Sequence, residues 1–212
     1  MELYFSPLAC SMATRMALYE AGAAARFVYV DGKSKRLADG SDYLAINPMG
    51  QVPALRTGEG EILTENPVVL QYVADQYPDA GLAPPAGRSE RYKLQRWLNF
   101  VTSELHKLVF TPLLSPTAPE GAKAFAREKA ELRFKVLDDY LEEAEFLLDR
   151  FTIADCYLAT VLNWAGFAGI DLARFPNVQA YFQRLKKRPS VARAMAEELA
   201  LYKEEQARRQ AA

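Results

Sequence analysis

The chain has 212 residues, half of them apolar and a quarter charged, and its 26 basic and 27 acidic residues leave a formal charge of −1. This composition is typical of globular proteins with one or two domains, and it lacks the concentrated positive charge that nucleic-acid binding needs. No apolar run approaches the roughly 18 residues of a membrane span, and the first ten residues lack the pattern of a signal peptide. Two cysteines make no disulfide framework, so we expect a protein of a reducing compartment, the cytoplasm.

The first 80 residues alternate short apolar runs with helical patterns. Asn66 is predicted to cap its helix, with Pro67 at the first helical position. This order of elements predicts a small mixed sheet with helices packed against it. The expected strands are 2–6 and 26–31 and a hairpin of 51–57 with 61–64, and the expected helices are 11–22 and 66–78.

The remainder of the chain follows a linker, "PDAGLAPPAGR" (78–88), and shows no strand pattern. Thr152 and Asp155 have the spacing of a capping box at the start of one helix. The second half therefore reads as an all-helical domain. Its expected helices are 88–114, 120–146, 153–168, 176–188 and 190–205.

Two stretches of the first half carry groups that suit ligand binding. If the Val52-Pro53 bond is cis, both backbone polar groups of Val52 face outward and an extended peptide can pair with them; the alternative is an ordinary trans proline at a sheet edge. Glu65 precedes a helix that starts at Asn66, so an ammonium and a carboxylate can bind side by side there. The alternative is a solvated Glu65 and a capping Asn66.

In the second half, Asn99, Ser103 and His106 have i, i+4, i+7 spacing and are expected on one helix face. That face lies beside an apolar stripe with 4-3-4-3 spacing, formed by Leu94, Leu98, Val101, Leu105 and Leu108. His106 is the only histidine, which excludes metal sites built on several histidines. These residues either line a cleft or have a structural or solvated role.

Cys10 is expected at the start of a helix, next to Ser11. The helix dipole favours a thiolate at that position, whereas a small buried side chain is the alternative. Ser11 is a candidate N-cap or hydroxyl donor. Cys156 lies in the middle of a helical pattern and is interpreted as a core residue.

Taken together, these pieces resemble the cytosolic glutathione transferases, over nearly the whole chain. The matching motifs are "ACS" (9–11), "NPMGQVPAL" (47–55), "LTEN" (63–66), the linker, "WLNFVTSELHK" (97–107) and "FTIADCY" (151–157). Cys10, Lys35 and the Asn99–His106 pattern are similar to the bacterial beta class. The resemblance implies a thioredoxin-like glutathione-binding domain (1–78), a linker (79–87) and an all-helical domain (88–212) with the electrophile pocket, usually in a homodimer.

The resemblance also implies roles for the N-terminal residues. Val52, before a cis Pro53, would pair with the cysteinyl part of glutathione, and Lys35 would reach its glycine carboxylate. Glu65 would hold the γ-glutamyl ammonium, and the N–H of Asn66 the neighbouring carboxylate. The family commonly has serine where this chain has Asn66.

Cys10 would face the glutathione sulfur with Ser11 as a nearby hydroxyl donor. Asn99, Ser103 and His106 would approach from the helical domain. The apolar residues expected to line the electrophile pocket are Leu8, Leu108, Val109, Phe110, Leu113, Trp164 and Phe167.

The function implied is conjugation of glutathione to small hydrophobic electrophiles, with glutathione as co-substrate and no cofactor or metal. Two alternatives stay open: a monothiol, glutathione-dependent disulfide reductase or peroxidase acting through Cys10, and a non-enzymatic ligand-binding protein on the same fold. The residues do not identify the electrophile, nor do they decide between detoxification and another pathway.

Overall fold

The structure, a computed structural model, describes residues 1–211 and divides into two compact units. The first unit comprises Met1–Leu82 and the chain from Pro189 onward, and the second comprises Ala83–Arg188. Within the described residues, none of the helices combines the length and hydropathy of a membrane span.

The first unit contains a four-stranded sheet of order β2-β1-β3-β4. β1 pairs in parallel with β2 and antiparallel with β3, and β3 pairs antiparallel with β4. This confirms the expected mixed sheet with helices, although each strand is shorter than expected. The elements are β1 (Glu2–Phe5), α1 (Met12–Glu20), β2 (Arg26–Tyr29), η1 (Tyr43–Ala45), β3 (Ala54–Arg56), β4 (Ile62–Leu63), α2 (Asn66–Gln76), η2 (Pro78–Ala80) and α9 (Pro189–Ala211).

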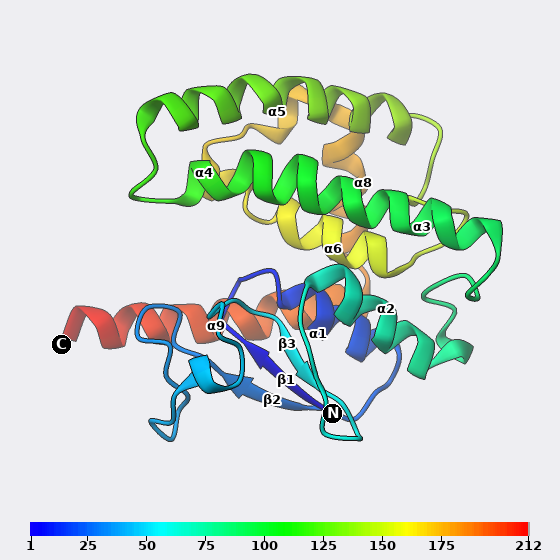
Figure 1. Cartoon of the computed structure of the whole chain (residues 1–212). Helices are drawn as coiled ribbons and strands as arrows, with labels where there is room; N and C mark the ends of the chain where they lie inside the picture. Colours follow the sequence, from blue (N-terminus) through cyan, green and yellow to red (C-terminus); the bar gives the residue numbers. More distant parts are fainter. Residues whose placement is uncertain (212) are drawn as a thin grey trace. The chain divides into compact units, whose positions relative to one another are not determined.

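The two faces of this sheet are covered differently. Leu3 pairs with Phe27 and Leu55, so these side chains share one face, and α1 covers it by placing Arg15 over the Phe27 ring. Figure 1 shows α1, α2 and α9 together on one side of the strands. On the other face, Tyr4 packs with Val30, Tyr43 and Ala54 beneath the segment that joins β2 to β3.

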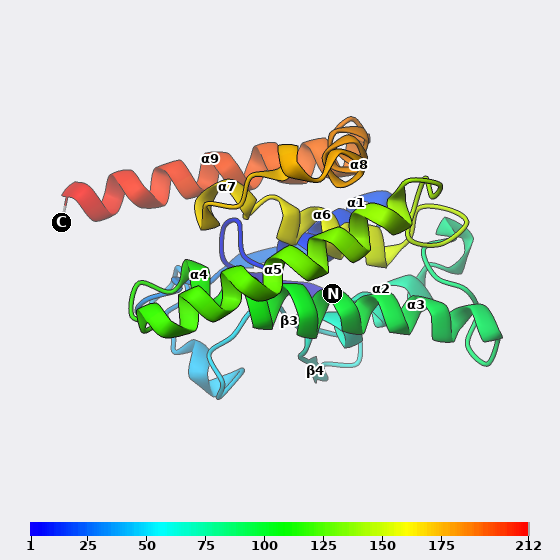
Figure 2. The same cartoon turned by 90° about the horizontal axis from the view of Figure 1, so that it is seen from above.

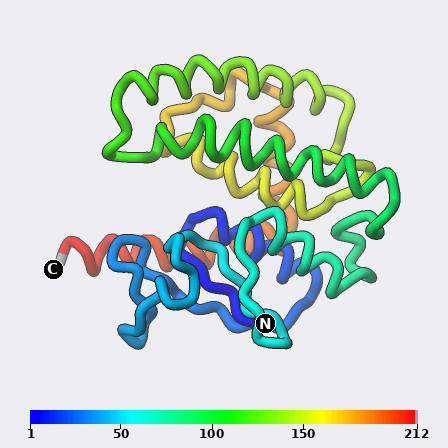
Figure 3. The backbone as a smooth tube through the Cα atoms, in the orientation of Figure 1, coloured from blue at the N-terminus to red at the C-terminus, as the bar shows by residue number. Residues whose placement is uncertain are grey.

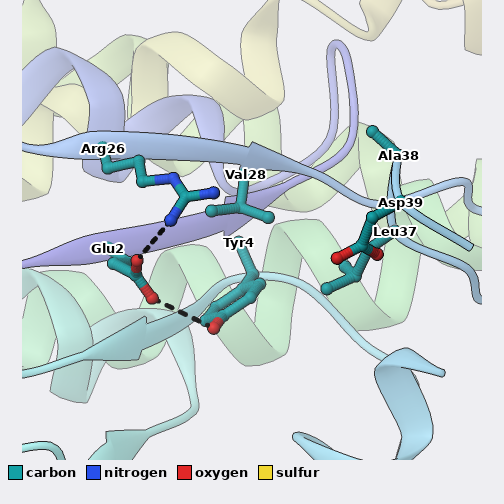
Figure 4. A pocket seen from close by; sticks show the side chains of 7 residues that line it. All are labelled: Glu2, Tyr4, Arg26, Val28, Leu37, Ala38 and Asp39. Atoms are coloured by element: carbon teal, nitrogen blue, oxygen red, sulfur yellow. Dashed lines mark hydrogen bonds and ion pairs between the residues drawn. The ribbon is translucent and has the colours of Figure 1, made fainter. Parts of the chain in front are cut away.

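A cavity of about 270 Å³ lies on that second face (Figure 4). At this cavity the Glu2 carboxylate accepts one hydrogen bond from Arg26 and one from the Tyr4 hydroxyl. None of the predicted site residues lines this cavity. Its lining residues are Glu2, Tyr4, Arg26, Val28, Leu37, Ala38 and Asp39.

The last helix, α9, belongs to the first unit, whereas the sequence led us to assign residues 88–212 to one helical domain. α9 packs against α1 (Figures 1 and 3). Val191 and Ala194 of α9 are fully buried, and Arg15 of α1 forms ion pairs with Glu197 and Glu198. The helical period alone does not reveal which unit a helix packs on.

The second unit is all-helical within its described residues, as expected. Its long helix α5 packs against the π-helical segment η3 and against α8 (Figure 2). Cys156 of α6 is fully buried, which confirms it as a core residue. The elements are α3 (Ser89–Asn99), η3 (Phe100–Phe110), α4 (Thr111–Leu114), α5 (Glu120–Leu141), α6 (Ile153–Leu162), α7 (Ala165–Ala168), η4 (Leu172–Arg174) and α8 (Pro176–Lys186).

The capping box at the start of α6 is present as predicted. The Thr152 hydroxyl accepts the N–H of Ala154 and donates to Asp155. The Asp155 carboxylate also accepts the N–H of Thr152 at 2.8 Å, the N–H of Leu147 at 3.0 Å and the hydroxyl of Tyr181 at 2.6 Å. Burial raises the pKa of Asp155 while these donors oppose the rise. One carboxylate thus fixes the helix start, the preceding loop and α8.

Removing the cap is predicted to lower stability. Thr152→Ala should cost about 1–2 kcal/mol of unfolding free energy, and Asp155→Ala about 3 kcal/mol because it leaves several buried donors without an acceptor. Urea denaturation followed by circular dichroism measures both. Asp171→Ala is the matched control, since the exposed Asp171 caps only η4; an equal loss in all three variants would contradict the prediction.

Candidate active site

Cys10 lies just before α1, at the end of a loop that returns from β1. Its thiol is half-buried, and Sγ donates to the carbonyl of Val52 at 2.9 Å. Ser11 occupies the N-cap position as predicted, but its side chain makes no cap bond. The Ser11 hydroxyl is fully buried and donates to the carbonyl of Ser6 at 3.4 Å. Ser11 therefore fixes the loop, and Cys10 presents the thiol.

The Val52-Pro53 peptide bond is cis, as the family resemblance implied. The expectation that both backbone groups of Val52 stay unpaired is wrong for the carbonyl, because it accepts the Cys10 thiol. The carbonyl of Gln51 accepts the Tyr43 hydroxyl at 2.7 Å and the Asn47 amide at 2.8 Å. Burial raises the pKa of Tyr43 to about 12, so this hydroxyl stays a donor.

α2 begins one residue earlier than predicted. Glu65 is the N-cap, with a φ of +64°, and Asn66 is the first helical residue. The Asn66 side chain is buried and links the starts of two helices: its Nδ2 donates to the carbonyl of Cys10 at 3.2 Å and its Oδ1 accepts the Thr14 hydroxyl at 3.3 Å. Glu65 itself is exposed. The first N–H groups of α2 are thereby held beside the Cys10 loop.

Lys35 lies in the segment between β2 and η1, with a φ of +57°. Its N–H donates to the carbonyl of Asp31 at 3.0 Å, and its carbonyl accepts the N–H of Tyr43 at 2.9 Å. Its side-chain stem passes Gly50, where an added Cβ would approach Cε to 3.3 Å and Cδ to 3.4 Å. Lys35 thus reaches the segment that carries Val52.

The structure joins Cys10, Val52 and Asn66 by direct hydrogen bonds, and it connects Lys35 to Val52 through Tyr43 and Gln51. Sequence reasoning missed the supporting residues Tyr43, Asn47 and Thr14. The "NPMG" motif offered one clue to Asn47, because an asparagine side chain at the start of a turn accepts a hydrogen bond from the backbone two residues further on. Asn47 Oδ1 accepts the N–H of Met49 at 3.2 Å.

Sequence reasoning also missed Glu198 of α9, which binds the backbone of the loop that leads to Cys10. Its fully buried carboxylate accepts the N–H of Leu8 at 2.8 Å, and Leu8 has a φ of +58°. Arg15 lies 3.0 Å away with its guanidinium over the Phe5 ring. Burial raises the pKa of Glu198 to about 7, although Arg15 favours the charged form.

Asn99, Ser103 and His106 belong to the second unit, and the shared helix face predicted for them is wrong. The segment after Asn99 is π-helical, and its i→i+5 winding rotates successive side chains differently from an α-helix. Asn99 and Ser103 are exposed, and the Ser103 hydroxyl donates to the Asn99 carbonyl at 3.0 Å. His106 instead turns inward, with Nδ1 at 2.7 Å from the Tyr157 hydroxyl.

Several residues expected to line an electrophile pocket are core residues of the second unit. Val109 and Phe110 are fully buried, and Phe110 packs edge-on against Phe134 and Trp164. Phe167 is exposed. The apolar residues that follow His106 therefore contribute more to the core of the second unit than to a surface pocket. Among the described residues, no cluster of His, Cys, Asp and Glu suits a metal ion.

Comparisons with known proteins match both halves of the chain. The family model described as glutathione S-transferase, N-terminal domain, matches residues 1–75, and the model for the C-terminal domain matches residues 101–189. The chain is 42% identical over 199 residues to glutathione S-transferase GstA of Escherichia coli O157:H7, covering 93% of this chain and 98% of that protein. It is 34% identical over 206 residues to glutathione S-transferase GST-4.5 of Xanthomonas campestris, with the same coverage.

Solved structures give the same result. A ternary complex of BphK, a bacterial GST, has a TM-score of 0.91 at 45% identity, covering 93% of this chain and 99% of that one. A bacterial beta class glutathione S-transferase of Sphingomonas chungbukensis has a TM-score of 0.90 at 44% identity, covering 93% and 98%. These similarities confirm the resemblance and the fold inferred from the sequence.

The histidine is predicted to be neutral at pH 7. Burial lowers the pKa of His106 to about 4 from 6.5. Between these values the folded state holds fewer protons than the unfolded state, so this contribution to stability is lost as pH falls from about 6.5 to about 4. Because His106 is the only histidine, its ring proton shifts in NMR report the midpoint directly.

Tyr157→Phe should leave the midpoint well below 6.5, since burial is the main cause and the phenylalanine keeps it. The urea-unfolded chain is the reference and should titrate near 6.5. A folded-state midpoint near that of the unfolded chain would refute the buried, neutral state.

Proposed function

The chain belongs to the glutathione S-transferase family, and on that premise we propose that it activates the thiol of glutathione and transfers it to small hydrophobic electrophiles. The observation that carries the proposal is the hydrogen-bonded set in the first unit. Cys10, Val52 and Asn66 come from three separate segments of the chain. Hydrogen bonds join Cys10 directly to Val52 and to Asn66. These are the residues to which the family resemblance gives the sulfur, backbone and carboxylate contacts of glutathione.

The proposed pose lays the tripeptide along Val52. The Val52 carbonyl has two lone pairs, so it can accept the cysteinyl N–H of glutathione as well as the Cys10 thiol. The γ-glutamyl carboxylate meets the N–H of Asn66 at the positive end of α2, and its ammonium meets Glu65. Lys35 takes the glycine carboxylate. Glutathione is the co-substrate in this proposal, and no further cofactor takes part.

Activation consists of stabilising the glutathione thiolate. Each unit by which a thiol pKa falls corresponds to about 1.4 kcal/mol of preference for the anion. The N-terminal end of α1, next to Cys10, supplies a favourable dipole and polar donors for that charge.

We further propose a cytoplasmic homodimer, the usual assembly that the resemblance implies, with detoxification of electrophiles as its task. One outward side of α5 supports an assembly contact: Phe125, Leu132, Val136 and Tyr140 are exposed there at spacings of 7, 4 and 4 residues. Exposed apolar stripes of this kind are typical of protein interfaces.

The test of the enzymatic role is Cys10→Ala, measured in two assays with purified protein. Conjugation of glutathione to an aromatic electrophile should persist, because the attacking thiol is that of glutathione. Reduction of a mixed disulfide should be lost, because Cys10 is the only cysteine that the described residues provide at this site. If wild-type protein neither binds glutathione in calorimetry nor conjugates it, the proposed function is wrong. If reduction is fast and conjugation absent, the monothiol reductase is the true activity.

Leu132→Asp is expected to convert the dimer into monomers, as a charge would be buried against an apolar partner surface. Molar mass from light scattering gives the result directly. Phe167→Asp, an equally exposed position on α7, is the control and should stay dimeric. A wild-type protein that is monomeric at micromolar concentration would exclude the assembly.

A further inference from the structure

The loop of residues 31–36 carries Lys35, and one carboxylate determines much of its shape. Oδ1 of Asp31 accepts three hydrogen bonds: from the N–H of Lys33 at 2.9 Å, from the N–H of Ser34 at 2.7 Å and from the hydroxyl of Ser34 at 3.0 Å. Lys33 and Ser34 are exposed, so no packing holds them in place. The turn immediately before Lys35 therefore depends on Asp31.

The other oxygen of Asp31 faces the rest of the first unit. Oδ2 accepts the Tyr29 hydroxyl at 3.4 Å, and the Arg209 guanidinium of α9 lies 3.5 Å from it. Hydrogen bonds from Ser34, the main cause, lower the pKa of Asp31 to about 2. The carboxylate is therefore ionised at neutral pH.

The backbone of Asp31 adds two further bonds to the same loop. Its carbonyl accepts the N–H of Lys35 and its N–H donates to the carbonyl of Arg36 at 2.9 Å. Lys35 has the left-handed backbone conformation, which is unfavourable for a residue with a side chain and needs support from its surroundings. With Gly50 leaving room for its stem, the direction of the Lys35 side chain is set by this loop.

We propose that Asp31 is the positioning residue for Lys35, and that it thereby sets the preference of the site for ligands with a carboxylate at the glycine end. This inference rests on the proposed function, because it assigns Lys35 to that carboxylate. Asp31 touches no ligand itself. Its effect is expected only where the ligand has a group for Lys35 to bind.

The experiment compares two ligands that differ in that group: glutathione and γ-glutamylcysteine, which lacks the glycine. Asp31→Ala should weaken glutathione binding about three- to fivefold, the scale of an exposed ion pair, and leave γ-glutamylcysteine unchanged. With glutathione as substrate, KM should rise and kcat at saturation should stay the same. Asp31→Asn, whose side-chain oxygen can still accept the Lys33 and Ser34 N–H groups, should restore part of the affinity. Calorimetry and steady-state kinetics measure these effects.

Two further variants isolate the coupling. Lys35→Ala should remove the difference between the ligands, and adding Asp31→Ala to it should cause no further loss. Asp39→Ala is the matched control, since the Asp39 carboxylate likewise accepts a backbone N–H and a serine hydroxyl, both from Ser41; this variant should bind both ligands normally.

Several outcomes would overturn the inference. Asp31→Ala that weakens both ligands equally would show a general effect on the fold, and unchanged glutathione binding would show no effect at all. Wild-type protein that binds glutathione no better than γ-glutamylcysteine would refute the role of Lys35 while leaving the proposed function intact. Wild-type protein that binds neither ligand would refute both proposals.

Discussion

The hydrogen bond from the Cys10 thiol to the Val52 carbonyl links two segments that are 42 residues apart in the chain. Each of these segments is also held by hydrogen bonds from other residues. Asn66 holds the Cys10 carbonyl, and Tyr43 and Asn47 hold the carbonyl of Gln51. A thiol and a peptide edge are thus set against one another before any ligand arrives. Preorganisation of this kind reduces the ordering cost of binding a flexible tripeptide.

Several residues near the Cys10 site have backbone conformations that residues other than glycine rarely adopt. Leu8, Lys35 and Glu65 have positive φ although none is glycine, and each precedes or carries a proposed site group. Hydrogen bonds support two of them: the Glu198 carboxylate of α9 accepts the N–H of Leu8, and within the same loop the Asp31 carbonyl accepts the N–H of Lys35. Residues of this kind persist only where their surroundings over-determine them, which is common at functional sites.

Much of this arrangement follows from local sequence patterns, and the remainder does not. The mixed sheet and the capping box of Thr152 and Asp155 rest on short-range rules, and the structure has both. Local rules left the Val52-Pro53 bond open between cis and trans, and only the family resemblance implied the cis bond that the structure has. The face expected for His106 assumed α-helical winding, which the π-helical segment η3 breaks. The assignment of α9 to the helical domain failed because its partners Arg15 and Leu8 lie more than 170 residues away in the chain. Nothing in a periodic pattern encodes such distant contacts.

The return of α9 to the first unit bears on how the chain folds during synthesis. The second unit, Ala83–Arg188, is continuous in sequence, whereas the first unit joins Met1–Leu82 to α9, which follows the second unit in the chain. The first unit therefore lacks the buried contacts of Val191, Ala194 and Glu198 until the whole second unit has been translated. Domains generally fold as units. The cysteine loop thus acquires the support of Glu198 only after α9 has been made, although its own residues are translated before the second unit.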